Sequence, residues 1–148
     1  MFVAKLLAVV VLSIPASAAD SPFAGAWKLN LAKSTTSSWE VVRSRNQIFQ
    51  VTLDGYRVTT GRASSTLYCD GQDRPRDTSS ASLLVGAETM NVECVNAHVI
   101  KTTYKRMGKP VATVTRTLSP DGFTMTTVVN GFTAKGEKLH SVLVYERN

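Results

Sequence analysis

The chain has 148 residues, with 17 Lys or Arg against 11 Asp or Glu and a formal net charge of +6 at pH 7. This length suits one domain with a single core. The basic residues are scattered, without a dense run or a basic helix with interleaved aromatic residues, so nucleic acid is not an expected partner. The excess positive charge favours solubility or the binding of an anionic ligand.

The first 18 residues have the features of a secretory signal peptide. Lys5 precedes an apolar run from Leu6 to Ile14, and the small-residue triplet Ala16-Ser17-Ala18 follows. The run has about nine residues, whereas a helix that spans a bilayer needs roughly 20, so a retained membrane anchor is the less favoured alternative. We expect cleavage after Ala18, no integral membrane segment afterwards, and a single secreted or periplasmic domain of residues 19–148.

The rest of the chain has the pattern of an all-β protein. Short β-branched and aromatic segments recur between turn residues, and helical periodicity is almost absent. Residues 31–45 and 70–88 resist strand assignment and are expected to be long loops. The predicted strands are Gly25–Asn30, Gln47–Leu53, Tyr56–Arg62, Ser65–Cys69, Thr89–Val95, His98–Arg106, Pro110–Leu118, Phe123–Val129 and Lys138–Glu146.

Turn residues connect these segments as hairpins. Asp54-Gly55, Met107-Gly108-Lys109 and Ser119-Pro120-Asp121-Gly122 each stand between two predicted strands. Glycine accepts positive φ and proline presets the first angle of a turn, so each of these segments favours a hairpin. Successive hairpins place neighbouring strands antiparallel. We therefore predict an antiparallel up-and-down β-barrel of about 8–10 strands.

Alternation along two late strands predicts which side chains share a face. In the last strand, one face has Leu139, Ser141, Leu143 and Tyr145. In the strand that ends at Leu118, one face has Ala112, Val114, Arg116 and Leu118. This face of the strand that ends at Leu118 thus mixes apolar groups with a single arginine, a composition that suits the amphipathic interior of a barrel.

The two cysteines, Cys69 and Cys94, are expected to form a disulfide, because an exported protein enters an oxidising compartment. The bond would close a loop of about 26 residues and stabilise the fold by roughly 3 to 3.5 kcal/mol in the chain-entropy model. Two alternatives stay open: a pair of buried thiols, and a metal site that uses Cys94 and His98. This spacing is weak evidence for a metal, so no metal and no cofactor are expected.

The first predicted strand reads Phe23-Ala-Gly-Ala-Trp-Lys-Leu29, and the chain ends in Tyr145-Glu-Arg-Asn148. These segments resemble the calycin superfamily, in which lipocalins have Gly-x-Trp on the first strand. The fatty-acid-binding branch opens with Phe-x-Gly-x-Trp-Lys-Leu and closes with Tyr-Glu-Lys/Arg. The stretch from Trp27 to Ser34 also resembles uncharacterised exported bacterial proteins of similar length.

The resemblance implies roles at the floor of the barrel. Gly25 would let the first strand bend, Trp27 would plug the floor, and Arg147 is a candidate partner of this ring. If the resemblance is set aside, the alternative is that Trp27 is an ordinary core residue and that Gly25 marks a β-bulge. The family's two capping helices are not expected, because residues 31–45 are rich in Ser and Thr. An open mouth, as in lipocalins, fits better.

The fatty-acid-binding branch holds a ligand carboxylate with an arginine on a late strand and an Arg-x-Tyr on the last strand. Arg116 and Tyr145 match two of these three positions, and Leu143 stands at the third. The resemblance therefore implies an incomplete carboxylate clamp. An arginine inside a barrel needs a partner or an anionic ligand, because an unpaired buried charge costs several kcal/mol. The alternative is an Arg116 that faces solvent.

The sequence has no recognisable catalytic motif. His98 and His140 stand at no motif spacing from a nucleophile or a carboxylate, and phosphate-binding glycine loops do not occur. Asp70, Asp73 and Asp77 alternate with arginines in a polar loop, which indicates surface ion pairs more than an acid/base site. The protein is therefore not expected to be an enzyme.

The predicted function is that of an exported lipocalin-like protein, which binds a small hydrophobic or anionic amphipathic ligand inside the barrel. The alternative is an envelope protein-interaction or inhibitor module, which would use the loop of residues 70–88 on a barrel with a filled interior. The expected ligand-binding residues are Arg116, Tyr145, Tyr104, Phe49, Met125 and Leu143, with Val51 and Val114 as further lining.

Overall fold

The computed structural model describes residues 21–37, 46–76, 86–132 and 136–148, and the predicted signal peptide lies outside them. Within these ranges the protein is all-β, with one short 3-10 turn at Leu31–Lys33. The strands are β1 (Gly25–Leu29), β2 (Thr35–Thr36), β3 (Asn46–Thr52), β4 (Gly55–Thr60), β5 (Ala63–Tyr68), β6 (Asp73–Pro75), β7 (Thr89–Asn96), β8 (Val99–Arg106), β9 (Lys109–Leu118), β10 (Thr124–Phe132) and β11 (Lys138–Arg147).

Neighbouring strands pair antiparallel in the order β5-β4-β3-β1-β11-β10-β9-β8-β7-β6, and β2 adds to β11. The predicted all-β, up-and-down architecture is confirmed, and each predicted strand corresponds to one long strand of the sheet. The prediction of plain loops at 31–45 and 70–88 is wrong in part, because β2 and β6 form there. Each of them adds only two or three residues to an existing strand, so its own sequence needs no alternating pattern.

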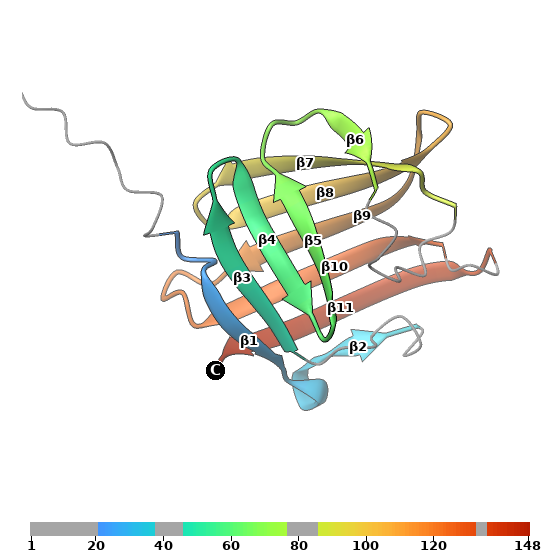
Figure 1. Ribbon diagram of the computed structural model, residues 1–148. Coiled ribbons are helices and arrows are strands. Elements are labelled where there is room, and N and C mark those ends of the chain that lie inside the picture. Colours follow the sequence, from blue (N-terminus) through green and yellow to red (C-terminus); the bar gives the residue numbers. More distant parts are fainter. Residues whose placement is uncertain (1–20, 38–45, 77–85, 133–135) are drawn as a thin grey trace, which may run out of the picture.

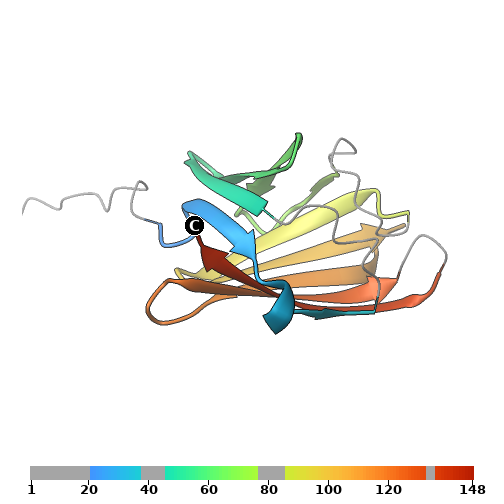
Figure 2. The same cartoon turned by 90° about the horizontal axis from the view of Figure 1, so that it is seen from below.

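The sheet curls on itself without closing into a ring. Figure 1 shows β3, β4 and β5 in front of the strands β7 to β11, and Figure 2 shows these three strands as a layer above the others. We call β3–β5 the arm and β7–β11 the wall. β1 joins them, because it pairs with β3 on one side and with β11 on the other. No ladder between described residues joins β5 to the wall, so the fold is a strongly curled half-barrel.

The main core lies between the arm and the wall. Burial of each large apolar side chain there stabilises the fold by about 1.5–3 kcal/mol. A smaller cluster of Ala112, Val114, Val129 and Leu139 belongs to the wall alone. The main cluster contains Phe49, Val58 and Leu67 of the arm, Phe23, Trp27 and Leu29 near β1, and Met90, Val92, Ile100, Leu118, Met125, Leu143 and Tyr145 of the wall.

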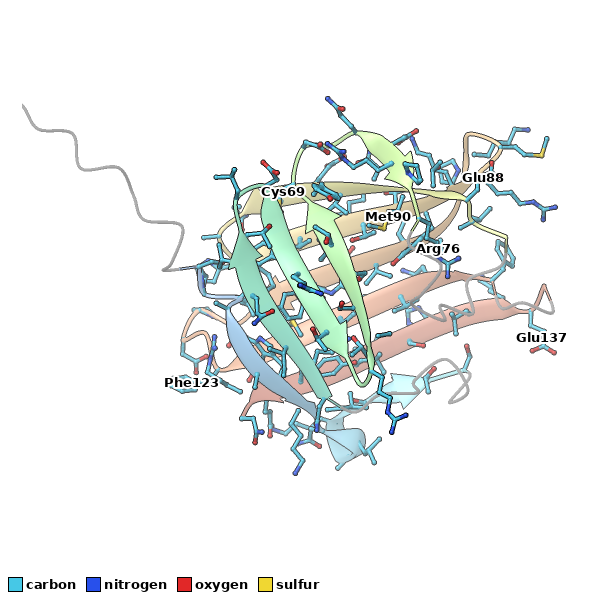
Figure 3. All side chains as sticks on the ribbon, in the orientation of Figure 1. Cys69, Arg76, Glu88, Met90, Phe123 and Glu137 are labelled. Carbon is cyan, nitrogen blue, oxygen red and sulfur yellow. A yellow bond between two sulfur atoms is a disulfide. The ribbon has the colours of Figure 1, made fainter. Side chains whose placement is uncertain are left out.

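Trp27 and Arg147 close one end of the half-barrel. Trp27 is buried, and its indole N–H donates to the carbonyl oxygen of Phe23 at 2.9 Å. The Arg147 guanidinium lies over the indole ring. Gly25 has a φ of +123°, and a Cβ atom there would lie 2.8 Å from Nη1 of Arg147. Phe123 lies at the same end, because its carbonyl oxygen accepts a hydrogen bond from the N–H of Arg147. Figure 3 shows Phe123 at this end of the molecule and Glu88 and Glu137 at the opposite end.

Candidate ligand-binding site

The alternation of β9 turns Arg116 toward the inside of the half-barrel. Ala112, Val114 and Leu118 share its face, and all three are buried. Since facing residues in adjacent strands point to the same side of a sheet, Arg116 stands in an inner row with its register partners Ile100 of β8 and Thr127 of β10. The solvent-facing alternative for Arg116 is therefore wrong.

Arg116 is a buried cation with few partners. Only 9% of its surface is exposed. Its Nη1 donates to Oγ1 of Thr102 at 3.5 Å, and its Cζ atom lies 5.9 Å from the centre of the Phe49 ring. Its buried Nε atom has no hydrogen-bond partner among the described residues, and neither has Oγ1 of Thr127. No salt bridge to Arg116 forms within the described part of the chain.

Burial shapes the electrostatics of this interior. Desolvation lowers the pKa of Arg116, and the nearby Tyr104 and Tyr145 hydroxyls oppose that effect. Burial likewise raises the pKa of the Tyr145 phenol, and the Arg116 charge opposes it. Arginine stays protonated in proteins even when buried, so a positive charge remains inside the half-barrel. An arginine fork of this kind matches a carboxylate or phosphate group.

Most of the predicted ligand-binding residues belong to the same buried interior as this charge. Phe49, Met125, Leu143 and Tyr145 belong to the main core cluster, and Tyr104 packs against both clusters. Val114 is also buried, two residues before Arg116 on the same face of β9, and it belongs to the smaller cluster. Val51 differs, because it lines a pocket on the outside. The arrangement is an apolar interior with one cation and two phenols.

Buried hydroxyls complete the interior, and none of them was predicted to be a site residue. Thr102 is completely buried and Thr127 is 4% exposed, one on each side of Arg116 in the neighbouring strands. Ser141 is 1% exposed, and its hydroxyl shares a hydrogen bond of 2.6 Å with Oγ1 of Thr36. The alternation along each strand could have predicted their burial, because each of them stands on the same face as buried apolar neighbours.

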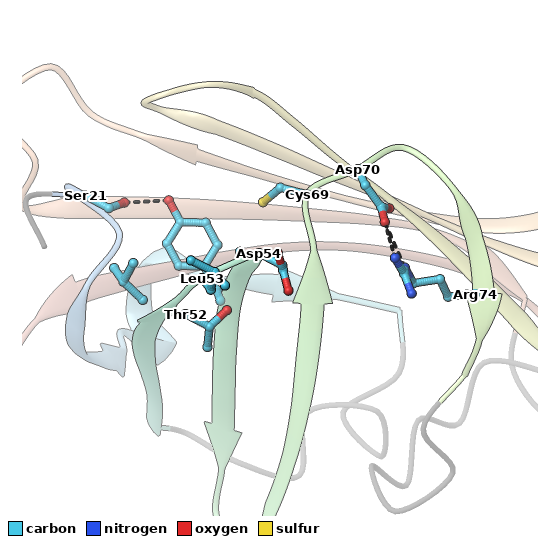
Figure 4. Close-up of a pocket in the computed structure, with 10 residues that line it drawn as sticks. Ser21, Thr52, Leu53, Asp54, Cys69, Asp70 and Arg74 are labelled. Atoms are coloured by element: carbon cyan, nitrogen blue, oxygen red, sulfur yellow. Dashed lines mark hydrogen bonds and ion pairs between the residues drawn. The ribbon is translucent and has the colours of Figure 1, made fainter. Parts of the chain in front are cut away.

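A second feature is an outer pocket of about 560 Å³ beside the disulfide. Its lining includes Thr52 at the end of β3, Leu53 and Asp54 of the turn that follows, and Cys69 and Asp70. Figure 4 shows these side chains around the opening, with an ion pair between Asp70 and Arg74. Arg74 also lies over the Tyr68 ring, with its Cζ atom 4.3 Å from the ring centre.

Cys69 and Cys94 form the predicted disulfide, with their Cα atoms 5.1 Å apart. The alternatives of two free thiols and of a Cys94–His98 metal site are therefore wrong.

The loop proposed for the alternative function is described at residues 70–76 and 86–88, and its middle lies outside the described residues. No helix in the described ranges is long and apolar enough to cross a membrane.

No protein-family model matches the chain, and no curated protein is similar enough to it to count as a relative. The class of the protein therefore follows from the fold and the interior alone. It is an antiparallel half-barrel with a buried, charged interior, and this fold is compatible with the calycin resemblance.

Proposed function

We propose that the protein binds a small amphipathic anion inside the half-barrel, with the acid group at Arg116 and the apolar part against the core. One observation favours this function above others: the guanidinium of Arg116 is buried, and no carboxylate in the described residues pairs with it. Leaving a buried cation unpaired costs several kcal/mol, and an anionic ligand offsets that cost.

The surroundings of Arg116 suit such a ligand. Charge-assisted hydrogen bonds from the guanidinium would fix the acid group, and the hydroxyls of Thr127 and Tyr145 lie on neighbouring strands as further donors. Contact with Phe49 and Met125 would supply apolar burial, at about 25 cal/mol per Å² removed from water. Polar groups would orient the ligand and apolar burial would provide most of the affinity.

The same proposal covers the kind of protein and its location. The Gly25 and Trp27 pattern and the half-barrel support a lipocalin-like member of the calycins. The disulfide supports a secreted or periplasmic protein, since such bonds persist in oxidising compartments. Binding rather than catalysis is the proposed role, because the sequence lacks any recognisable catalytic motif.

The test is a titration of the purified protein with an environment-sensitive fluorescent fatty acid, followed by displacement with palmitate and with the uncharged alcohol of the same length. We expect palmitate to displace the probe at lower concentration than the alcohol. In the Arg116→Gln variant the preference should fall by about tenfold or more, because a charge-assisted pair at a buried site is lost.

Arg106→Gln is the matched control, since Arg106 is exposed on the same sheet and lies outside the interior. It should leave both affinities unchanged. Absence of saturable probe binding to the wild-type protein overturns the proposal. An equal preference for palmitate in the wild-type and Arg116→Gln proteins removes Arg116 from the site.

A further inference from the structure

The open side of the half-barrel is a seam between β5 and β7. Within the described residues, β5 pairs only with β4, and β6 covers β7 only from Thr89 to Asn91. Beyond that point the disulfide is the covalent connection across the seam, from the residue after β5 to the sixth residue of β7. One backbone hydrogen bond lies beside it, from the N–H of Gly71 to the carbonyl oxygen of Val92 at 3.0 Å.

The arm that this disulfide holds is the cover of Arg116. β3 is anchored through its pairing with β1, and β4 and β5 follow as an extension of that edge. Phe49, Val58 and Leu67 of the arm are all buried in the cluster shared with the wall. The Phe49 ring of the arm lies over the guanidinium, 5.9 Å from its Cζ atom to the ring centre. Moving β5 away from β7 would therefore uncover the buried cation.

The disulfide can be reached from outside. Both cysteines are half-buried rather than fully enclosed. Cys69 lines the outer pocket of about 560 Å³, whose rim includes Leu53, a residue with 98% of its surface exposed. In Figure 4 the Cys69 side chain lies among the labelled pocket residues, next to Asp70. The pocket thus gives a thiolate a path to a bond that a closed barrel would shield.

We propose that Cys69–Cys94 is a thiol–disulfide exchange site that latches the arm over Arg116, and that an external dithiol reduces it through the outer pocket. One thiolate of the dithiol attacks a sulfur of the bond and releases the other cysteine as a thiolate, which takes up a proton. The second thiol of the dithiol then displaces the attacked cysteine. The protein gains two thiols and the partner gains one disulfide.

Reduction leaves β5 without its covalent connection to β7, so the arm opens more often and exposes the interior. One consequence of opening, the release of a bound anion, rests on the proposed function. The opening itself is independent of any ligand and can be measured without one. The partner is defined by its chemistry, a dithiol able to enter the pocket.

The test measures the rate at which phenylglyoxal, an arginine reagent, modifies Arg116 in the intact protein. Oxidised protein is compared with protein reduced by dithiothreitol, and peptides are quantified by mass spectrometry. Exposed Arg106 is the internal reference. We expect reduction to raise the Arg116 rate by about tenfold or more relative to Arg106, because local opening controls access to buried groups.

A Cys69→Ser/Cys94→Ser variant should show the fast rate without reductant and no further change with it. An unchanged Arg116 rate after reduction overturns the latch. Loss of the far-ultraviolet β signal in the reduced protein or in the variant also overturns it, since the bond would then be a plain structural crosslink. Fatty-acid release is measured separately: exposure of Arg116 without any fatty-acid binding refutes the proposed function and leaves the latch standing.

Discussion

The guanidinium of Arg147 lies over the indole ring of Trp27, with its Cζ atom 4.3 Å from the ring centre. The same group donates to the carbonyl oxygens of Pro22, Ala24 and Gly122, at distances from 2.6 to 3.2 Å. One side chain at the end of the last strand therefore connects the segment before β1, the buried tryptophan and the β9–β10 turn.

Replacement of Arg147 by Met should lower the free energy of unfolding by roughly 2 to 4 kcal/mol. The variant loses hydrogen bonds from a charged donor and the cation–π contact, while part of the apolar stem remains. Urea denaturation followed by circular dichroism measures the change. Arg106→Met is the control and should stay within about 0.5 kcal/mol, as is usual for an exposed site. A similarly small effect at Arg147 would contradict its role at the closed end.

Gly25→Ala should destabilise the same end. The residue has a φ of +123°, which side chains rarely adopt, and its new Cβ atom would lie 2.8 Å from Nη1 of Arg147. The control is Gly108→Ala, where φ is +75° but no atom lies within 4 Å. We expect a loss of about 1 kcal/mol at Gly108, from the backbone alone, and a clearly larger loss at Gly25. In the Arg147→Met background the extra loss at Gly25 should shrink, because the clash with Nη1 is gone and the backbone strain remains.

The sequence allowed the strands, their antiparallel order and the disulfide to be predicted, because these depend on local alternation, turn residues and the number of cysteines. The inward face of β9 also followed from alternation, and so did the idea of an arginine among apolar groups. The open seam did not follow, because β5 and β7 differ from paired strands in no local feature. Thr102 and Thr127 were missed for a related reason: threonine occurs on both faces of these strands, and only their places beside Arg116 mark them. Thr127 is its register partner on β10, and Thr102 on β8 accepts its hydrogen bond.

Removal of the disulfide should cost stability without unfolding the protein. Cys69 and Cys94 are 25 positions apart, and a crosslink over such a loop contributes about 3 kcal/mol through the entropy of the unfolded chain. We expect the free energy of unfolding of the Cys69→Ser/Cys94→Ser variant to be lower by this amount. Its urea denaturation should remain a single transition, at a lower urea concentration. The reduced wild-type protein should match it. A much smaller loss would mean that the unfolded chain keeps these segments together.

Acid should weaken the contact between β6 and β8. The hydrogen bond from Lys105 holds the pKa of the Asp73 carboxyl below its ordinary value, and a second hydrogen bond from Asn91 adds to this. Because the folded-state pKa is the lower one, the stabilisation is present above the ordinary pKa of Asp and is lost as pH falls through the folded value. Asp73→Asn should therefore lose less stability than the wild-type protein between pH 5 and pH 2. Equal losses in the two proteins would show that Asp73 makes no such contribution.

Arg116→Met separates stability from function in the interior. An unpaired buried cation costs free energy, and a methionine of similar reach removes that cost while keeping contact with Phe49. We expect the free energy of unfolding without ligand to rise by about 1 to 3 kcal/mol, whereas stabilisation by added palmitate should disappear. Leu118→Ala is the reference for an ordinary buried residue on the same strand, and it should lose about 2 to 5 kcal/mol.

Thermal and urea unfolding with and without palmitate distinguish the outcomes. A residue retained for binding destabilises the empty protein and is compensated only by its ligand, whereas a residue retained for the fold stabilises the empty protein as well. If Arg116→Met loses as much stability as Leu118→Ala, the guanidinium supports the fold itself, and the proposed anion site loses the observation on which it rests. A gain in stability joined to a loss of the palmitate effect would show that the buried charge is kept at a cost to the fold, for the sake of an anionic ligand.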